Sequence, residues 1–187
     1  EPVNVFNMYV KVGKWEKAEM IIKKYMKDED FSKVIVKEAM KYEQEGKYKE
    51  AEKLYIIAGE HDIAISMYKN LKQYDNMIRL VSQYRQDFLK NTHHMVAQYL
   101  EADKNLKSAE KHYIESGNWK GACQMYSSHN MSEESLRVAK ANGSKNEINE
   151  LAKKWVANLS KDEALKMLLS MSLGEAAIDI LCDSKDF

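Results

Sequence analysis

Five histidines and two cysteines are the side chains in this 187-residue sequence that are best suited to metal binding or nucleophilic chemistry. A metal site on one helix needs two ligands about one turn apart, as in an i,i+4 histidine pair. His93 and His94 are adjacent, so on a helix their side chains would point about 100° apart. Cys123 and His129 are six residues apart, which is not a ligand spacing on one helix face either. We therefore predict no metal site, and we interpret the histidines as packed or solvated side chains at His61, His93, His94, His112 and His129.

Carboxylates are the other candidates for chemistry, because paired acidic side chains can act as a general acid and a general base. Glu43 with Glu45, and Glu133 with Glu134, form such pairs, but the charged and solvated face of a helix accounts for them. We also interpret the face that carries Glu50, Glu52 and Lys53 as solvated surface. The sequence contains no glycine-rich phosphate loop and no G-x-S-x-G nucleophile turn. We predict no catalytic residue, no cofactor site and no enzymatic activity.

The charges are balanced, with 29 basic and 29 acidic side chains and a formal net charge of zero. This balance argues against binding nucleic acid, which relies on neutralising phosphates. No apolar run approaches the 18 or more residues of a membrane-spanning helix, so we predict no direct membrane insertion. Cys123 and Cys182 lack a C-x-x-C spacing, which favours two buried thiols in a reducing, cytoplasmic compartment.

A short sequence pattern recurs along the chain, and the elements that it predicts must position any functional side chains. Residues 46–55, 59–68 and 117–126 share the pattern G-x-(aromatic)-x-x-A-x-x-x-Y, and residues 13–18 open in the same way. Taking the alanine as an anchor, apolar or small residues recur three, four and seven positions later. This spacing is one stripe of an α-helix.

The spacing of the anchors predicts the architecture. Nine of the twelve steps between successive anchors are 13 residues, and the others are 20, 19 and 16. Ten residues form about three helical turns, and the remaining three residues make a turn so short that neighbouring helices must be antiparallel. We predict an all-α fold, an α-solenoid of about thirteen short helices in antiparallel hairpins. The anchors are Val5, Ala18, Phe31, Ala51, Ala64, Met77, Val96, Ala109, Ala122, Ser135, Ile148, Ala164 and Ala177.

Each slot of the repeat has a physical role. Glycine before a unit suits the left-handed residue that ends a helix, alanine allows two helices to approach closely, and tyrosine or tryptophan fills the gaps between layers. We therefore predict two sets of repeat-packing residues. The anchors of the first set are Ala18, Ala51, Ala64, Met77, Ala109, Ala122, Ala164 and Ala177. The aromatic residues of the second set are Trp15, Tyr48, Tyr55, Tyr68, Tyr113, Trp119 and Tyr126.

We interpret residues 1–187 as a single solenoid segment with breaks or kinks near 87–91 and 142–145. Thr92 is the expected N-cap after the first break, and Ser144 with Glu147 matches a capping box after the second. Phe187 occupies the aromatic slot of a repeat that is missing, so we expect a piece of a longer array.

The repeat unit resembles degenerate tetratricopeptide repeats, although two 13-residue steps give about 26 residues per hairpin instead of 34. The ordered series of residues 46–55, 74–81, 106–113 and 132–139 is similar to the tetratricopeptide-like region of a large subunit of the intraflagellar transport family. The similarity is strongest over residues 46–140.

This resemblance implies a structural scaffold arm in a ciliary transport train, with other intraflagellar transport subunits, those of the B complex, as partners. It places the protein in the cytoplasm, at the ciliary base and in the cilium. It implies no catalytic residues in such an arm. Two alternatives stay open, namely an arm of another vesicle-coat or trafficking complex and a free adaptor that binds peptides. Self-association is also left open.

Overall fold

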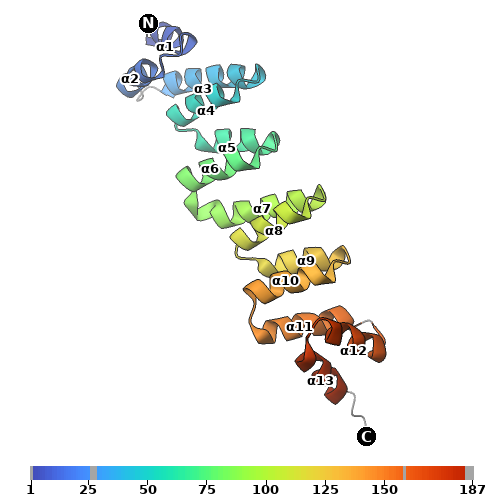
Figure 1. The fold of residues 1–187 in the computed structure, drawn as a ribbon. Coiled ribbons are helices and arrows are strands. Elements are labelled where there is room, and N and C mark those ends of the chain that lie inside the picture. Colours follow the sequence, from blue (N-terminus) through green and yellow to red (C-terminus); the bar gives the residue numbers. More distant parts are fainter. Residues whose placement is uncertain (1, 26–28, 158, 184–187) are drawn as a thin grey trace. The chain divides into compact units, whose positions relative to one another are not determined.

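A computed structural model describes residues 2–25, 29–157 and 159–183. These residues form thirteen α-helices and one short 3-10 helix, with no strand among them, as the 13-residue step predicts (Figure 1). The first helices are α1 (Pro2–Lys11), α2 (Trp15–Tyr25), α3 (Glu29–Gln44), α4 (Tyr48–Ile57), α5 (His61–Asn70) and α6 (Tyr74–Tyr84). After η1 (Gln86–Phe88) come α7 (Leu89–Ala102), α8 (Leu106–Glu115), α9 (Trp119–Ser128), α10 (Ser132–Asn142), α11 (Lys145–Val156), α12 (Lys161–Ser170) and α13 (Gly174–Asp183).

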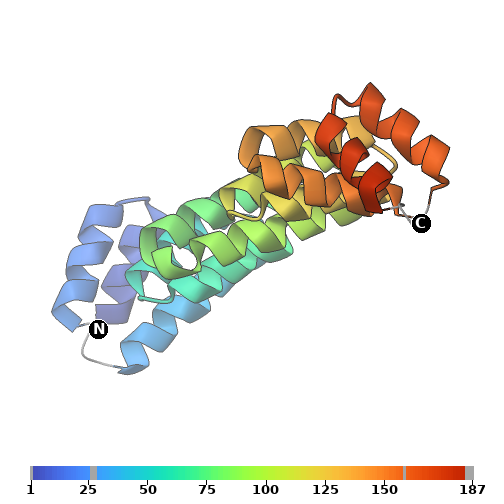
Figure 2. The same cartoon turned by 90° about the horizontal axis from the view of Figure 1, so that it is seen from below.

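The chain divides into two compact units, Glu1–Gln86 and Asp87–Phe187. In the first unit, α1 packs on α2, α3 on α4 and α5 on α6 as antiparallel hairpins, and α4 contacts α5 (Figure 2). In the second unit, α7 packs on α8 and α9 on α10, α8 contacts α9, and α11, α12 and α13 pack together beyond α10. The boundary lies at the start of the predicted break at 87–91.

The N-cap expected at Thr92 is wrong. The chain turns through η1, and α7 begins at Leu89, so Thr92 lies inside the helix and is 8% exposed. The helix begins earlier because Gln86–Phe88 supplies a tight 3-10 turn that leads into it, and a 3-10 turn is common at a helix N-terminus.

The repeat anchors occupy one position of the helices. In eleven of the thirteen described helices, the anchor is the fourth residue, as Ala51 is in α4 and Ala122 in α9. Val5 is an exception in burial, because it is 38% exposed whereas the neighbouring Phe6 is fully buried. The stripe of α1 is therefore one residue out of phase with our assignment. The side chain of Phe31 and all of Phe187 lie outside the described residues.

Most turns between helices place one residue in the left-handed region, always five positions before an anchor. Four of these residues are glycines and four are not: Gly13, Gly46, Gly59, Gly117, Lys72, Lys104, Asn130 and Ser172. The following N–H reaches back over the turn, as Lys47 N donates to Tyr42 O at 2.8 Å after Gly46. Asn105 N donates to Leu100 O in the same way, also at 2.8 Å, after Lys104. The turns are thus helix-ending Schellman motifs.

Exchanging residue types at two of these turns should change stability in opposite directions. Gly46 has φ of 75° and open space around an added Cβ, so Gly46→Ala adds only backbone strain, about 1 kcal/mol. Lys104 has φ of 60°, and Lys104→Gly relieves that strain and should raise the free energy of unfolding by up to about 1 kcal/mol. Urea unfolding of each variant measures both values. A Gly46→Ala protein as stable as the wild type would contradict the left-handed turn.

The second break, at 142–145, has different chemistry. Gly143 has an extended backbone instead of a left-handed one, and Ser144 caps α11. The Glu147 carboxylate accepts from Ser144 N at 3.0 Å, and Glu147 N donates to Ser144 Oγ at 3.4 Å. The hydrogen bond from Lys120, together with those from Ser144, lowers the pKa of Glu147 to about 2. The predicted capping box at this position is therefore confirmed.

Candidate functional site: the repeated polar network

Four of the predicted packing tyrosines lie in the core, and the hydroxyl group of each donates a hydrogen bond. Tyr55, Tyr68, Tyr113 and Tyr126 stand four residues after an anchor and are at most 5% exposed. Burying a tyrosine ring requires a partner for its hydroxyl, because an unpaired polar group in the core is costly. In each case a glutamate on the preceding helix accepts the hydrogen bond. The contacts are Tyr55–Glu43 at 2.7 Å, and Tyr68–Glu52, Tyr113–Glu101 and Tyr126–Glu110 at 2.6 Å.

In the first unit, Glu52 joins three consecutive helices. Its Oε2 atom on α4 accepts from the Tyr68 hydroxyl on α5 and from Arg79 Nη2 on α6, at 2.6 and 2.7 Å. The Glu52 side chain is only 13% exposed. Burial and the hydrogen bond to Glu52 both raise the pKa of Tyr68. This contact ties the α3–α4 hairpin to the α5–α6 hairpin.

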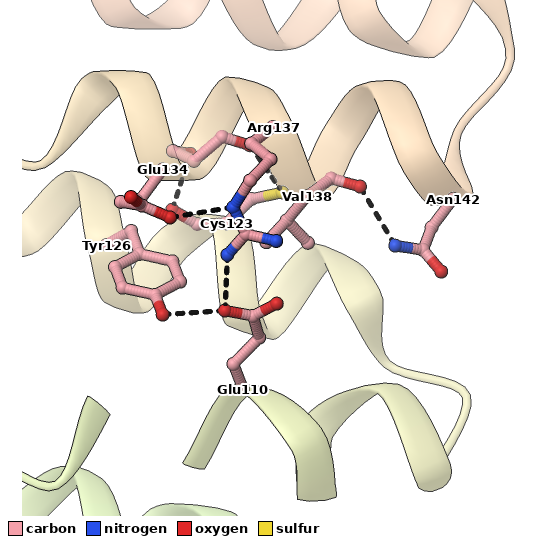
Figure 3. A network of polar contacts seen from close by, with 8 residues as sticks. Glu110, Cys123, Tyr126, Glu134, Arg137, Val138 and Asn142 are labelled. Atoms are coloured by element: carbon pink, nitrogen blue, oxygen red, sulfur yellow. Dashed lines mark hydrogen bonds and ion pairs between the residues drawn. The ribbon is translucent and has the colours of Figure 1, made fainter. Parts of the chain in front are cut away.

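The second unit contains the same arrangement, which Figure 3 shows from close by. Tyr126 on α9 and Arg137 on α10 converge on Oε2 of Glu110 on α8, each at 2.6 Å. Arg137 Nε also donates to Glu134 at 2.7 Å. Burial alone would raise the pKa of Glu110, but the hydrogen bonds from Arg137 and Tyr126 lower it on balance. Glu110 is therefore an anion at neutral pH, and it accepts charge-assisted hydrogen bonds from Arg137 and Tyr126.

The two networks match residue for residue. Each member in the first unit has the same residue type 58 positions later in the second: Glu43/Glu101, Glu52/Glu110, Tyr55/Tyr113, Tyr68/Tyr126 and Arg79/Arg137. The helices α3 to α6 thus correspond to α7 to α10. We call the set Glu52, Tyr68 and Arg79, with its counterpart Glu110, Tyr126 and Arg137, the inter-hairpin network.

The sequence interpretation of Glu43 and Glu52 as members of solvated helix faces is wrong. Glu43 and Glu52 each accept a hydrogen bond from a buried tyrosine. Periodicity within one helix misses this because Glu52 follows its anchor directly and lies at the flank of the apolar stripe. The signal that could have identified it is the 58-residue recurrence, since a solvated face has no reason to keep glutamate, tyrosine and arginine at fixed spacing.

The other predicted packing residues form two groups, the buried anchors and three half-buried aromatic residues. The anchors Ala18, Ala51, Ala64, Met77, Ala109, Ala122, Ala164 and Ala177 are at most 3% exposed. Trp15, Tyr48 and Trp119 are half-buried at the first position of their helices. Trp15 stacks under a cation, with Lys53 Nζ 5.0 Å from its ring centre. The ring of Trp119 lies against Gly143, where an added Cβ would come within 2.8 Å of it.

One anchor of the second unit, Ser135, is polar, so the core of this unit differs there from the core of the first unit. Ser135 is fully buried where the first unit has Met77, and its hydroxyl donates to Cys123 O at 2.8 Å. The Cys123 thiol in turn donates to Ser135 O at 3.3 Å. Burial raises the pKa of the Cys123 thiol to about 11, so it is protonated and a poor nucleophile at neutral pH. The expectation of two buried thiols is wrong for Cys182, which is exposed.

Among the described residues, no group of three or more His, Cys, Asp or Glu side chains is placed to hold a metal ion. Within the same part of the chain, no helix combines the length and the apolar character that crossing a bilayer requires.

A groove of about 690 Å³ lies between α9 and α11 in the second unit. Trp119, Gln124, Leu151 and Trp155 contribute to its walls. Lys120 on α9 and Glu147 on α11 also line it and bridge the two helices at 2.7 Å. The opposite charges therefore compensate each other within the groove.

Comparison with known proteins identifies relatives of nearly the whole chain. The chain is 42% identical to the intraflagellar transport protein 172 homolog of Danio rerio and 39% identical to that of Homo sapiens, over 98% of its length in both cases. It is 41% identical to intraflagellar transport protein 172 of Chlamydomonas reinhardtii over 96% of its length. No family model matches the chain. The chain spans about 10% of the length of each of these relatives. Across nearly its whole length, the chain is thus homologous to one partial region of intraflagellar transport protein 172.

Proposed function

We propose that this chain is a stretch of the scaffold arm of an intraflagellar transport subunit and that it acts in protein–protein assembly without catalysis. One observation carries the proposal. Relatives in a fish, a mammal and a green alga are named intraflagellar transport protein 172, and the similarity to each runs along at least 96% of the chain. Other train subunits, those of the B complex, are the proposed partners, and the cytoplasm, the ciliary base and the cilium are the proposed locations.

The inter-hairpin networks support an arm that holds its shape. Glu52 and Glu110 each bind groups from the two following helices, so successive hairpins share a charged and largely buried acceptor. Helical repeats are stabilised by such contacts between neighbours, and the outer faces of their helices remain available to partners. The chemistry that recurs in both units is thus structural.

The alternative of a peptide-binding adaptor is disfavoured because a charged residue of the groove does not recur at the corresponding position of the first unit. An adaptor that reads a peptide along its repeats needs the same polar groups at corresponding positions of the groove. Lys120 in the groove between α9 and α11 corresponds to Asp62 in the first unit, which has the opposite charge. Asp62 is engaged by Arg85, whose Nε donates to it at 2.8 Å.

Cross-linking mass spectrometry on intact trains from ciliated cells tests the assignment, with the full-length subunit in place. We expect lysines of this stretch, such as Lys120 and Lys154, to cross-link to other train subunits. Recovery of the full-length protein only in non-ciliary fractions, with cross-links to vesicle-coat subunits instead, would replace the proposal with the coat-arm alternative.

A pair of variants in the full-length subunit links this function to the arm. The double change Tyr68→Ala with Tyr126→Ala removes both buried rings and should reduce co-precipitation of other train subunits. The matched double change to phenylalanine keeps the rings and should preserve co-precipitation. Equal co-precipitation by the two variants, at equal protein levels, would show that the folded arm is not needed for assembly.

A further inference from the structure

Two histidines face each other between α7 and α8. The Nδ1 atoms of His93 and His112 lie 2.9 Å apart, and the ring centres are 5.2 Å apart with planes inclined by 31°. Both side chains are half-buried in the hairpin interface. The sequence interpretation considered only pairs on one helix and therefore missed a pair that forms across a hairpin.

The corresponding pair in the first unit is purely apolar. Ile35 and Leu54 occupy the positions 58 residues earlier, on α3 and α4, and they are 1% and 0% exposed. The second unit thus has two titratable rings where the first unit has two aliphatic side chains. A stable hairpin does not require histidine at these positions, as α3–α4 shows.

The geometry limits how many protons the pair can hold. Two neutral rings form one N–H···N hydrogen bond, with one Nδ1 donating and the other accepting. One added proton leaves this bond in place, because the second ring can still accept through Nδ1. Two added protons would bring two N–H groups together at 2.9 Å with no acceptor between them, along with two positive charges.

The surroundings oppose protonation of His93 on balance. Burial lowers the pKa of His93 below its ordinary value of 6.5; Glu115 on α8 raises it, and Lys111 on α8 lowers it further. His94, the neighbour on α7, packs edge-on against Tyr113 with ring centres 5.6 Å apart, and Asn118 lies 3.5 Å from its Nδ1. Tyr113 in turn donates to Glu101, so the pair lies beside the polar contact that fastens α8 to α7.

We propose that the facing imidazoles of His93 and His112 make the α7–α8 hairpin an acid-sensitive joint, which is closed at neutral pH and opens when both rings are protonated. The sign follows from linkage. The open state binds one more proton than the closed state below pH 6.5, so closure is favoured above that pH and weakens as the pH falls. The closed hairpin excludes one proton from a histidine that has the ordinary pKa of 6.5 in the open state. The ratio of open to closed hairpin therefore rises about thirty-fold between pH 7.5 and pH 5.0.

Hydrogen exchange of the 187-residue chain at pH 7.5 and pH 5.0 tests the proposal, with rates corrected for the intrinsic effect of pH. We expect protection factors in α7 and α8 to fall about thirty-fold relative to those in α3 and α4, which serve as the internal reference. The double variant His93→Ile with His112→Leu copies the first unit and should abolish this difference. His129→Gln removes a histidine elsewhere and should leave the difference unchanged. An α7–α8 hairpin whose protection changes with pH no more than that of α3–α4 would overturn the proposal.

Nitrogen NMR of the imidazoles gives a second readout that needs no variant. In the closed hairpin at pH 5.0, one of the two Nδ1 atoms should keep the chemical shift of an unprotonated acceptor. Protonation of Nδ1 on both rings, with the exchange protection of α7 and α8 intact, would equally refute the proposal.

Discussion

Replacing Tyr126 by alanine is expected to lower the free energy of unfolding by about 3–5 kcal/mol, whereas Tyr126→Phe should lower it by only about 1 kcal/mol. The alanine variant leaves a cavity the size of an aromatic ring where the side chain is 1% exposed. The phenylalanine variant keeps the ring and loses only the hydrogen bond to Glu110. Glu110 retains Arg137 as a donor in both variants, which limits the cost of removing the hydroxyl.

Urea unfolding of the 187-residue chain measures both values, and the first unit provides a replicate. Tyr68→Ala and Tyr68→Phe should show the same large and small losses, because Tyr68 makes the corresponding contact with Glu52. Leu169→Ala is a suitable surface control, since Leu169 is 63% exposed and its removal should change stability by no more than about 0.5 kcal/mol. If Tyr126→Phe costs as much as Tyr126→Ala, the hydrogen bond outweighs the packing of the ring.

The fold was largely predictable because one physical requirement acts on every helix. Each short helix must bury a single stripe of residues against its neighbours, so small or apolar residues recur at the same position of successive helices. Ala51, Ala64 and Ala122 mark that position, and each is fully buried. The 13-residue step fixes the helix length and leaves only a short turn. These constraints are local, and therefore they are visible in the sequence.

The polar contacts were not predictable in the same way because their partners lie on different helices. Glu110 is bound by residues 16 and 27 positions later, and His93 faces a residue 19 positions later. None of these three spacings places the two residues on one face of a single short helix. Only the 58-residue correspondence between the units connects Glu110 with Glu52, and it also reveals that His93 replaces an isoleucine.

The boundary between the two units, at Gln86 and Asp87, was also only partly predictable from the sequence. The step of 19 residues between Met77 and Val96 indicated an irregular link, and Thr92 has the residue type of an N-cap. α7 begins three residues before Thr92, directly after the 3-10 turn of Gln86–Phe88, so its anchor is its eighth residue. A cap assigned from residue type alone is therefore wrong where the helix length departs from the repeat.

The alanine anchors lead to the second large expected effect, since Ala64→Trp should lower the free energy of unfolding by about 1–3 kcal/mol or more. Ala64 is fully buried as the fourth residue of α5, so a tryptophan at this position must push neighbouring helices apart or adopt a strained rotamer. Ser66→Trp is the matched control, because Ser66 is an exposed residue of the same helix and its replacement should change stability little. Thermal and urea unfolding of both variants compare the two positions. Unfolding of Ala64→Trp at the wild-type midpoint would show that the helices are not held together closely at the anchor, and close packing would then no longer explain why alanine occupies this slot.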